Sequence, residues 1–238
     1  LRVRRKTTFV CINPEKFSLQ KYIVLGVCAV GIPAAIQNLL NVTGMTILNN
    51  FTSSYGAQAV AAMGITQKIN MVPLQVAMGF SQGIMPLISY NYASGNHRRM
   101  KETIFFTIKT LLPFLVVVSL GYFAGAGLLT RAFMDNEAIV AYGTKFLRGF
   151  CLGLPFLCMD FLAVGVFQAV GMGKAALSFA ILRKIVLEIP ALYLLNSLFP
   201  LYGLSYAQLV AELVLSIASV IMLARIFRRM QREDGASS

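Results

Sequence analysis

The chain contains 238 residues, of which 57% are hydrophobic and 13% are charged, and its mean hydropathy is +0.71. This balance lies outside the usual range for a soluble globular domain and indicates a membrane protein. Four cysteines and a single histidine, scattered along the chain, are too few for the usual structural metal site or for a disulfide framework.

Long apolar segments recur along the chain, and each can cross a hydrocarbon core, which needs roughly 20 helical residues. They predict an all-α integral membrane fold with six transmembrane helices. The expected spans are residues 22–48, 60–90, 103–128, 138–170, 175–196 and 204–227. Prolines inside the spans predict bends, because neighbouring helices in a membrane can satisfy the backbone groups that a proline frees. These prolines are Pro33, Pro73, Pro86, Pro113, Pro155 and Pro190.

The basic residues, which give a net charge of +12, are distributed asymmetrically about the spans. Fourteen lie in the N-terminal segment, the second and fourth loops and the C-terminal segment, whereas the other loops contain only Arg131. This bias predicts a multi-pass protein of the plasma membrane with both termini in the cytoplasm and with contacts to anionic lipid. A nucleic-acid partner is therefore not required. We divide the chain into a basic cytoplasmic linker (1–21), a transmembrane lobe (22–228) and a cytoplasmic tail (229–238).

The first span carries three amide side chains within the stretch GIPAAIQNLLN. Gln37, Asn38 and Asn41 fall at positions i, i+1 and i+4, which places them on one narrow face of a helix. Lipid cannot form hydrogen bonds with these amides. They therefore indicate either hydrogen bonds between helices, each worth about 0.6 to 2 kcal/mol, or a water-filled cavity.

Three acidic residues lie within the later spans. Glu188 follows Lys184 by four residues, which is the spacing of an intrahelical ion pair. Glu212 has no basic residue within four positions, and its surroundings stay open. The third is Asp160, which is the only charged residue in the stretch CMDFLAVGVFQAVG.

Asp160 is the sharpest functional candidate. Its nearest basic neighbours in the sequence, Arg148 and Lys174, are twelve and fourteen positions away, or roughly 18 to 21 Å along a helix. A carboxylate in an apolar cavity has its neutral form favoured, so it can exchange a proton or bind a cation as access alternates between the two sides. The alternative is a structural aspartate that is protonated or hydrogen-bonded to another helix.

The stretches GIPAAIQNLLN, GFSQGIMPLISYNYASGNHRRMK and CMDFLAVGVFQAVGMGK together resemble the multidrug and toxic compound extrusion (MATE) family. The resemblance covers nearly the whole chain, is closest to the MepA-like branch, and is to the C-terminal six-helix lobe. It implies a twelve-helix transporter with two lobes around a central cavity. The chain begins with Leu1 rather than methionine, which is consistent with an internal fragment whose partner is the N-terminal six-helix lobe.

In the NorM-like branch of this family, a fourth-span aspartate, a tyrosine one turn earlier and a first-span glutamate look like a cation site. Asp160 stands at the aspartate position, but Phe156 replaces the tyrosine and Asn41 replaces the glutamate. The resemblance therefore implies Asp160 and Asn41 as candidate cation-coupling or proton-coupling residues, with a weaker sodium site. The choice between proton and sodium stays open, as does coupling through the other lobe.

The resemblance implies secondary active export of organic cations and hydrophobic drugs, without a cofactor other than the coupling ion and without an enzymatic reaction. A chain with 11 methionines and 17 phenylalanines can offer an adaptable apolar surface to varied substrates. The candidate residues of the substrate cavity are Gln37, Asn38, Phe156, Met159, Gln168 and Glu188.

Three other functions compete with export. A flippase for lipid-linked sugars, from the same superfamily, needs a more cationic cavity, and Lys68, Arg183 and Lys184 keep it open. A membrane enzyme needs clustered nucleophiles or paired carboxylates, which the sequence does not present at usable spacing. A purely structural membrane subunit accounts for the topology but leaves Asp160 unexplained.

Overall fold

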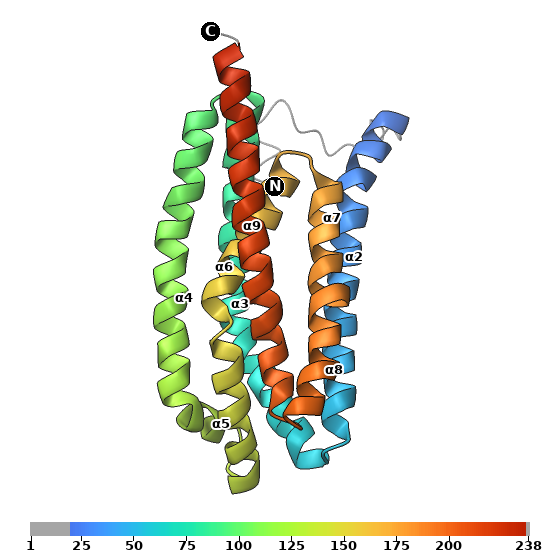
Figure 1. Cartoon of the computed structure of the whole chain (residues 1–238), viewed down its shortest axis with the longest axis vertical. Helices are drawn as coiled ribbons and strands as arrows, with labels where there is room; N and C mark the ends of the chain where they lie inside the picture. The colour runs from blue at the N-terminus through green and yellow to red at the C-terminus, as the bar shows by residue number, and fades with distance from the viewer. Residues whose placement is uncertain (1–19, 237–238) are drawn as a thin grey trace, which may run out of the picture.

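The computed structural model describes residues 20–236, so nearly all of the predicted basic linker lies outside the described residues. Within this range every regular element is a helix (Figure 1). In chain order the elements are α2 (Lys21–Ser53), α3 (Ala57–Ala93), α4 (His97–Phe133), α5 (Glu137–Cys151), α6 (Leu154–Ala169), α7 (Gly173–Ile181), η2 (Leu182–Glu188), α8 (Ile189–Leu198) and α9 (Gly203–Ala236).

Four of the described helices are long and apolar enough to cross a membrane: α2 from Val24, α3, α4, and α9 as far as Arg228. The helices α5 and α6, which meet at an angle of 48°, together form a fifth candidate span. The remaining predicted span, 175–196, coincides with α7, η2 and α8, which follow one another but are only 9, 7 and 10 residues long. Helix α9 continues to Ala236, so most of the predicted tail is a continuation of this helix.

Two of the six prolines lie where a long helix is interrupted. Pro155 lies in the first turn of α6, and the chain bends just before it, because a proline lacks the amide hydrogen and its ring collides with the preceding turn. Pro190 follows η2, a π-helix in which the Ile189 amide donates to the Lys184 carbonyl, five residues back. The other four prolines lie inside the continuous helices α2, α3 and α4.

Both ends of the described chain lie at the same end of the helix bundle (Figure 1). The turn between α3 and α4 and the turn between α6 and α7 lie at this end too, so the basic residues that begin α4 gather here. The arrangement agrees with an even number of crossings. The assignment of this end to the cytoplasm stays a prediction.

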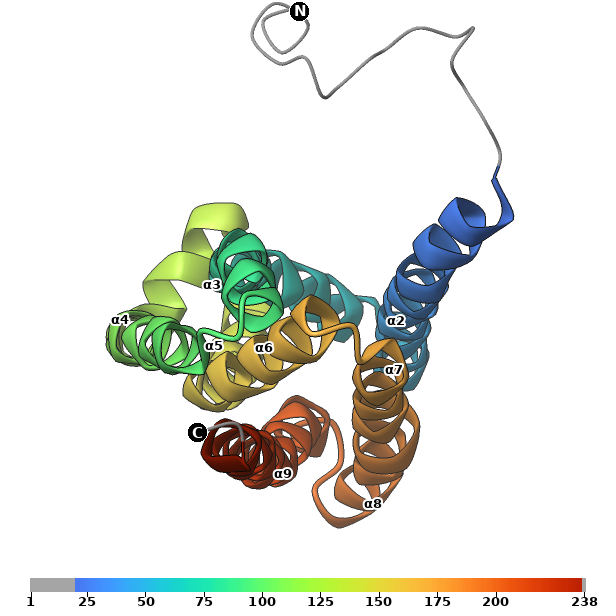
Figure 2. The same cartoon turned by 90° about the horizontal axis from the view of Figure 1, so that it is seen from above.

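Helix α6 is the central element of the lobe. Seen from above, α2 lies with α7 and α8 on one side, while α3, α4 and α5 lie on the other (Figure 2). Helix α6 packs against α3, α4, α7 and α9, and Leu162, Val166 and Phe167 are almost fully buried in the main apolar core. Large apolar side chains such as Phe106 and Leu128 are exposed on the outside of the bundle, as a lipid-facing surface requires.

Candidate functional site

The tertiary structure gives Asp160 a charged partner that is distant in the sequence. Asp160 is 2% exposed on α6, and its Oδ2 accepts a hydrogen bond of 3.0 Å from Nη1 of Arg183 on η2. Asp160 therefore lacks a basic neighbour along the sequence but has one in the folded chain. The sequence left open whether Asp160 is a coupling carboxylate or a structural aspartate that is protonated or bonded to another helix. The observed contact is a bond to another helix.

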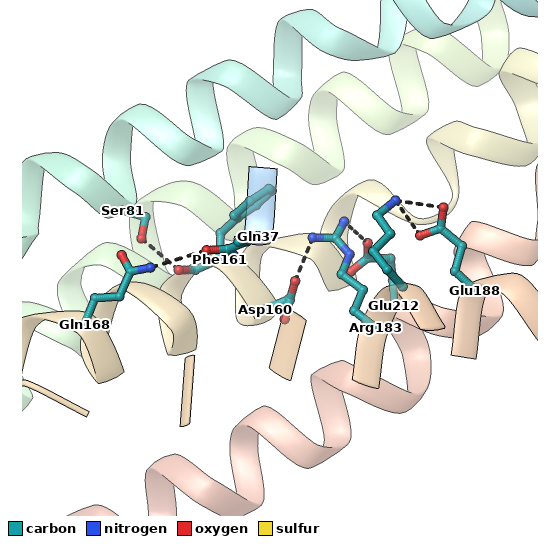
Figure 3. A network of polar contacts seen from close by, with 9 residues as sticks. Gln37, Ser81, Asp160, Phe161, Gln168, Arg183, Glu188 and Glu212 are labelled. Carbon is teal, nitrogen blue, oxygen red and sulfur yellow. Dashed lines mark hydrogen bonds and ion pairs between the residues drawn. The ribbon is translucent and has the colours of Figure 1, made fainter. Parts of the chain in front are cut away.

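Arg183 also binds Glu212, so it joins two carboxylates from two other helices (Figure 3). Its Nη2 donates to Oε1 of Glu212 on α9, and its guanidinium lies 5.4 Å from the centre of the Phe161 ring, within the range of a cation–π contact. The arginine, aspartate and glutamate side chains are 8%, 3% and 0% exposed, respectively. These three residues form what we call the buried triad.

A second ion pair lies beside the triad. Lys184 Nζ donates to Glu188 Oε1 at 2.8 Å and lies 2.7 Å from Oε2, so the pair expected from the spacing is present. Helix α2 passes close to this pair, because a Cβ on Gly44 would stand 3.1 Å from Lys184 Cδ. A glycine at this position lets α2 approach the charged groups.

The triad and the second pair together contain three carboxylates and two cations. If every group is ionised, the cluster carries one net negative charge. Asp160 Oδ1 and Glu212 Oε2 are buried without a hydrogen-bond partner among the described residues. Each of these oxygens keeps the capacity to accept a proton or a hydrogen bond.

A cavity of about 210 Å³ opens between α2, α3, η2 and α9, and it reaches the charged cluster. Its apolar lining includes three methionines, which are adaptable contacts for varied ligands. The methionines are Met45, Met71 and Met78, the amides are Asn41, Gln67, Asn70, Gln75 and Gln208, and the charged residues are Arg183, Lys184 and Glu188.

Asn70 is a cavity residue that the sequence reasoning missed. It is 3% exposed, and its Oδ1 has no hydrogen-bond partner within the described part of the chain. A buried amide oxygen without a partner is unfavourable, so it favours a ligand with a hydrogen-bond donor or a positive charge. The signal was available in the stretch GITQKINMVPLQ, where Asn70 lies three residues after Gln67.

A smaller cavity of about 110 Å³ lies between α2, α3 and α6. Gln168 Nε2 on α6 donates to Gln37 Oε1 on α2 at 3.3 Å, which joins two of the predicted residues (Figure 3). Asn38 also lines this cavity, although its Nδ2 donates to the Ala34 carbonyl of its own helix. Asn41 lines both cavities and so lies where they adjoin.

Helices α3 and α6 approach each other closely beside the smaller cavity. Ser81 Oγ donates to the Phe161 carbonyl at 2.7 Å, and a Cβ on Gly165 would overlap the Ser81 hydroxyl. The small residues therefore allow the two helices to approach closely, as is common in membrane proteins.

Phe156 and Met159 lie elsewhere, which corrects their assignment to the same cavity. They line an apolar hollow of about 400 Å³ next to Ser216 and Ile217 of α9. The reason is helical phase, because positions 156 and 159 share one face of α6 while Phe161 and Gln168 occupy another. Of the predicted site residues, the structure thus brings together Asn41 with Glu188, and Gln37 with Asn38, Asn41 and Gln168.

Solved structures with the same fold define the class of protein. An outward-facing multidrug resistance MATE family transporter matches with a TM-score of 0.88 at 19% identity, over 98% of this chain and 52% of that chain. The Vibrio cholerae MATE transporter VcmN in its bent form matches with a TM-score of 0.86 at 17% identity, over 96% and 52%. The fold is therefore a multi-pass, all-helical membrane domain that corresponds to half of a membrane transporter, which confirms the predicted fold class.

The MatE family model matches residues 33–194, and the chain belongs to this family of transporters, which are not enzymes. Similar relatives are the multidrug export proteins MepA of Staphylococcus saprophyticus, 32% identical over 92% of this chain and 48% of the relative, and of Staphylococcus haemolyticus, 31% identical over 95% and 50%. The resemblance to the MepA-like branch is confirmed. The chain spans about half the length of these relatives.

Proposed function

We propose that this chain is one lobe of a secondary active exporter of organic cations and hydrophobic drugs, driven by a proton or sodium gradient. The observation that carries the proposal is the cavity of about 210 Å³ between α2, α3, η2 and α9, which combines methionines and amides with Glu188. The lining also contains Arg183 and Lys184, but the cluster to which they belong has three carboxylates for these two cations. The cavity therefore offers adaptable apolar contacts beside a cluster with a negative net charge, which suits bulky ligands that carry a positive charge. The relatives are named multidrug export proteins, which agrees with the export of drugs.

An organic cation in this cavity meets Glu188 in its existing pair with Lys184. Binding of the ligand to Glu188 therefore competes with Lys184, and the unpaired Oδ1 of Asn70 is available to a donor group on the ligand. The affinity of the cavity for the ligand therefore depends on how strongly Lys184 binds Glu188. A ligand shifts the balance between two transporter states only through such differences in affinity.

Asp160 and Asn41 are the proposed coupling residues. A proton bound at Asp160 neutralises its carboxylate and so weakens its attraction to Arg183, which joins α6 to η2 and α9. Asn41 adjoins both cavities, so it can sense the contents of either. Alternating access follows if the weakened contact lets these helices shift against one another.

The proposed setting is the plasma membrane, with both termini in the cytoplasm and lipid around the apolar outer surface. The proposed partner in the complete transporter is an N-terminal six-helix lobe. The flippase alternative is supported by Arg183 and Lys184 in the cavity wall, but both are already paired with carboxylates. Because three carboxylates accompany these two cations, the cluster has no positive net charge for a sugar phosphate, and export is the better-supported function.

The test is uptake of a fluorescent cationic dye into energised inverted membrane vesicles that contain the natural protein. Proton and sodium gradients are applied separately to wild type and to Asp160→Asn. We expect gradient-driven uptake by wild type and its loss in Asp160→Asn. Asp135→Asn is the matched control, because Asp135 lies on the surface in an exposed pair with Arg131, and it is expected to transport normally.

Unchanged uptake in a well-expressed Asp160→Asn variant would show that Asp160 is structural and would move coupling to the other lobe. If wild type takes up none of a panel of cationic dyes, multidrug export is wrong. Movement of a lipid-linked sugar under the same conditions would then favour the flippase.

A further inference from the structure

The buried triad places one guanidinium between carboxylates from two different helices. Arg183 Nη1 lies 3.0 Å from Asp160 Oδ2 on α6, and Nη2 donates to Glu212 Oε1 on α9 (Figure 3). The planar fork of a guanidinium suits this arrangement, because its two nitrogens can serve two acceptors at once. The positive head group therefore occupies the space between the two carboxylates.

A free inorganic cation cannot use the same two carboxylate oxygens while Arg183 is in place. The three side chains are at most 8% exposed, so an incoming ion has to lose its water. It also has to approach a fixed positive charge at close range in a region of low dielectric, where the repulsion is strong. Asp160 Oδ1 and Glu212 Oε2 have no hydrogen-bond partner among the described residues, but they belong to carboxylates whose charge Arg183 already offsets. The residues at Asp160 thus favour the guanidinium over a sodium ion in this conformation.

The local backbone explains why Arg183 and Lys184, although adjacent, serve different partners. They lie on η2, whose π-helical hydrogen bonds precede Pro190. Arg183 points to α6 and α9, whereas Lys184 pairs with Glu188 and touches α2 near Gly44. π-helical segments often occur at functional sites, and this one delivers a single cation to the triad.

We propose that Arg183 is a tethered cation that takes the position of a free ion between α6 and α9, so that this lobe does not bind sodium at Asp160. Arg183 is then the residue that determines the ion preference of the site. The consequence for ion coupling rests on the proposed export function, whereas the binding of ions can be measured without transport.

The experiment measures thermal unfolding of the purified natural protein in detergent, in sodium chloride and in N-methylglucamine chloride at equal ionic strength. The Tm of wild type is expected to be the same in both salts. Arg183→Ala is expected to unfold at a lower temperature and to regain on the order of 5 °C as sodium saturates the vacated position. Guanidinium at millimolar concentration, which has the shape of the missing head group, is expected to act in the same way.

Two further variants locate the effect. Arg183→Ala combined with Asp160→Asn is expected to lose the response to sodium, because one of the two carboxylates is gone. Arg131→Ala is the matched control, since it removes an arginine from an exposed pair with Asp135, 3.7 Å away, and is expected to show no response.

A sodium-dependent rise in the Tm of wild type that Asp160→Asn abolishes would overturn the proposal. So would a folded Arg183→Ala that responds to neither sodium nor guanidinium. If Arg183→Ala does not fold, Arg183→Lys decides, because its tethered charge is expected to keep the protein insensitive to sodium and a response would contradict the proposal. A failure of dye transport by wild type would reject the export function and leave these measurements unaffected.

Discussion

Helix α6 carries two polar regions that are built in different ways. Asp160 belongs to the buried triad with Arg183 and Glu212, whereas Gln168, about two turns further on, bonds to Gln37 at the edge of the smaller cavity (Figure 3). The difference comes from the neighbouring helices, because η2 and α9 supply charges to one region and α2 supplies amides to the other.

The two regions show how the degree of burial selects the polar group. Charges in the triad are shielded from solvent, so each must be paired for the lobe to be stable. The amides of Gln37 and Gln168 are half-buried and cost less to leave unpaired. We therefore expect the triad to hold the helices together and the amides to exchange partners readily with a ligand.

Removal of Arg183 is expected to give the largest effect on stability. Arg183→Met leaves two carboxylates buried without their counter-ion, and we expect a loss of about 3–5 kcal/mol in the free energy of unfolding. Reversible unfolding in mixed detergent micelles measures this loss. Apolar replacement of all three members of the triad is expected to restore most of it, since no buried charge then remains unpaired. A loss below about 1 kcal/mol, as for an exposed ion pair, would show that the triad is not the main tie between these helices.

Ser81 lines the smaller cavity together with Gln37 and Gln168, and its removal is expected to have an intermediate effect. Ser81→Ala removes the hydrogen bond to the Phe161 carbonyl, which is worth about 1 kcal/mol. The same unfolding measurement applies, with Ser89→Ala as a control because Ser89 is exposed on the same helix. Equal effects of the two variants would contradict a specific role for the Ser81 contact.

The amide pair is expected to give the smallest effect on stability, about 0.6 kcal/mol for Gln168→Leu. Gln37→Leu is expected to give a similar loss, and the double variant no more than either single variant, because both remove the same hydrogen bond. These variants are expected to change which dyes are taken up, although their loss of stability is small. Additive losses in the double variant would mean that the two amides act independently.

The sequence by itself determined the helical runs. Runs of apolar residues set the helices, since only a helix or a closed barrel satisfies the backbone in lipid. Bends were predicted at six prolines, and two of these, Pro155 and Pro190, lie where the long helices are interrupted. The other four lie inside continuous helices. The spacing of Lys184 and Glu188 gave their ion pair. These features depend on covalent structure and on neighbours within one or two turns, which the sequence lists directly.

Only the tertiary structure decided which polar groups meet. Arg183 lies 23 residues from Asp160 and 29 from Glu212. The lack of a nearby basic residue in the sequence indicated that the two carboxyl groups need a distant partner or a proton, without identifying either. Packing also decides that Asn70 lines the cavity beside the charged cluster. It likewise decides that Phe156 lines a separate apolar hollow next to α9. The physical reason is that sequence periodicity gives the face of a helix, whereas the rotation and register of helices against one another decide what that face contacts.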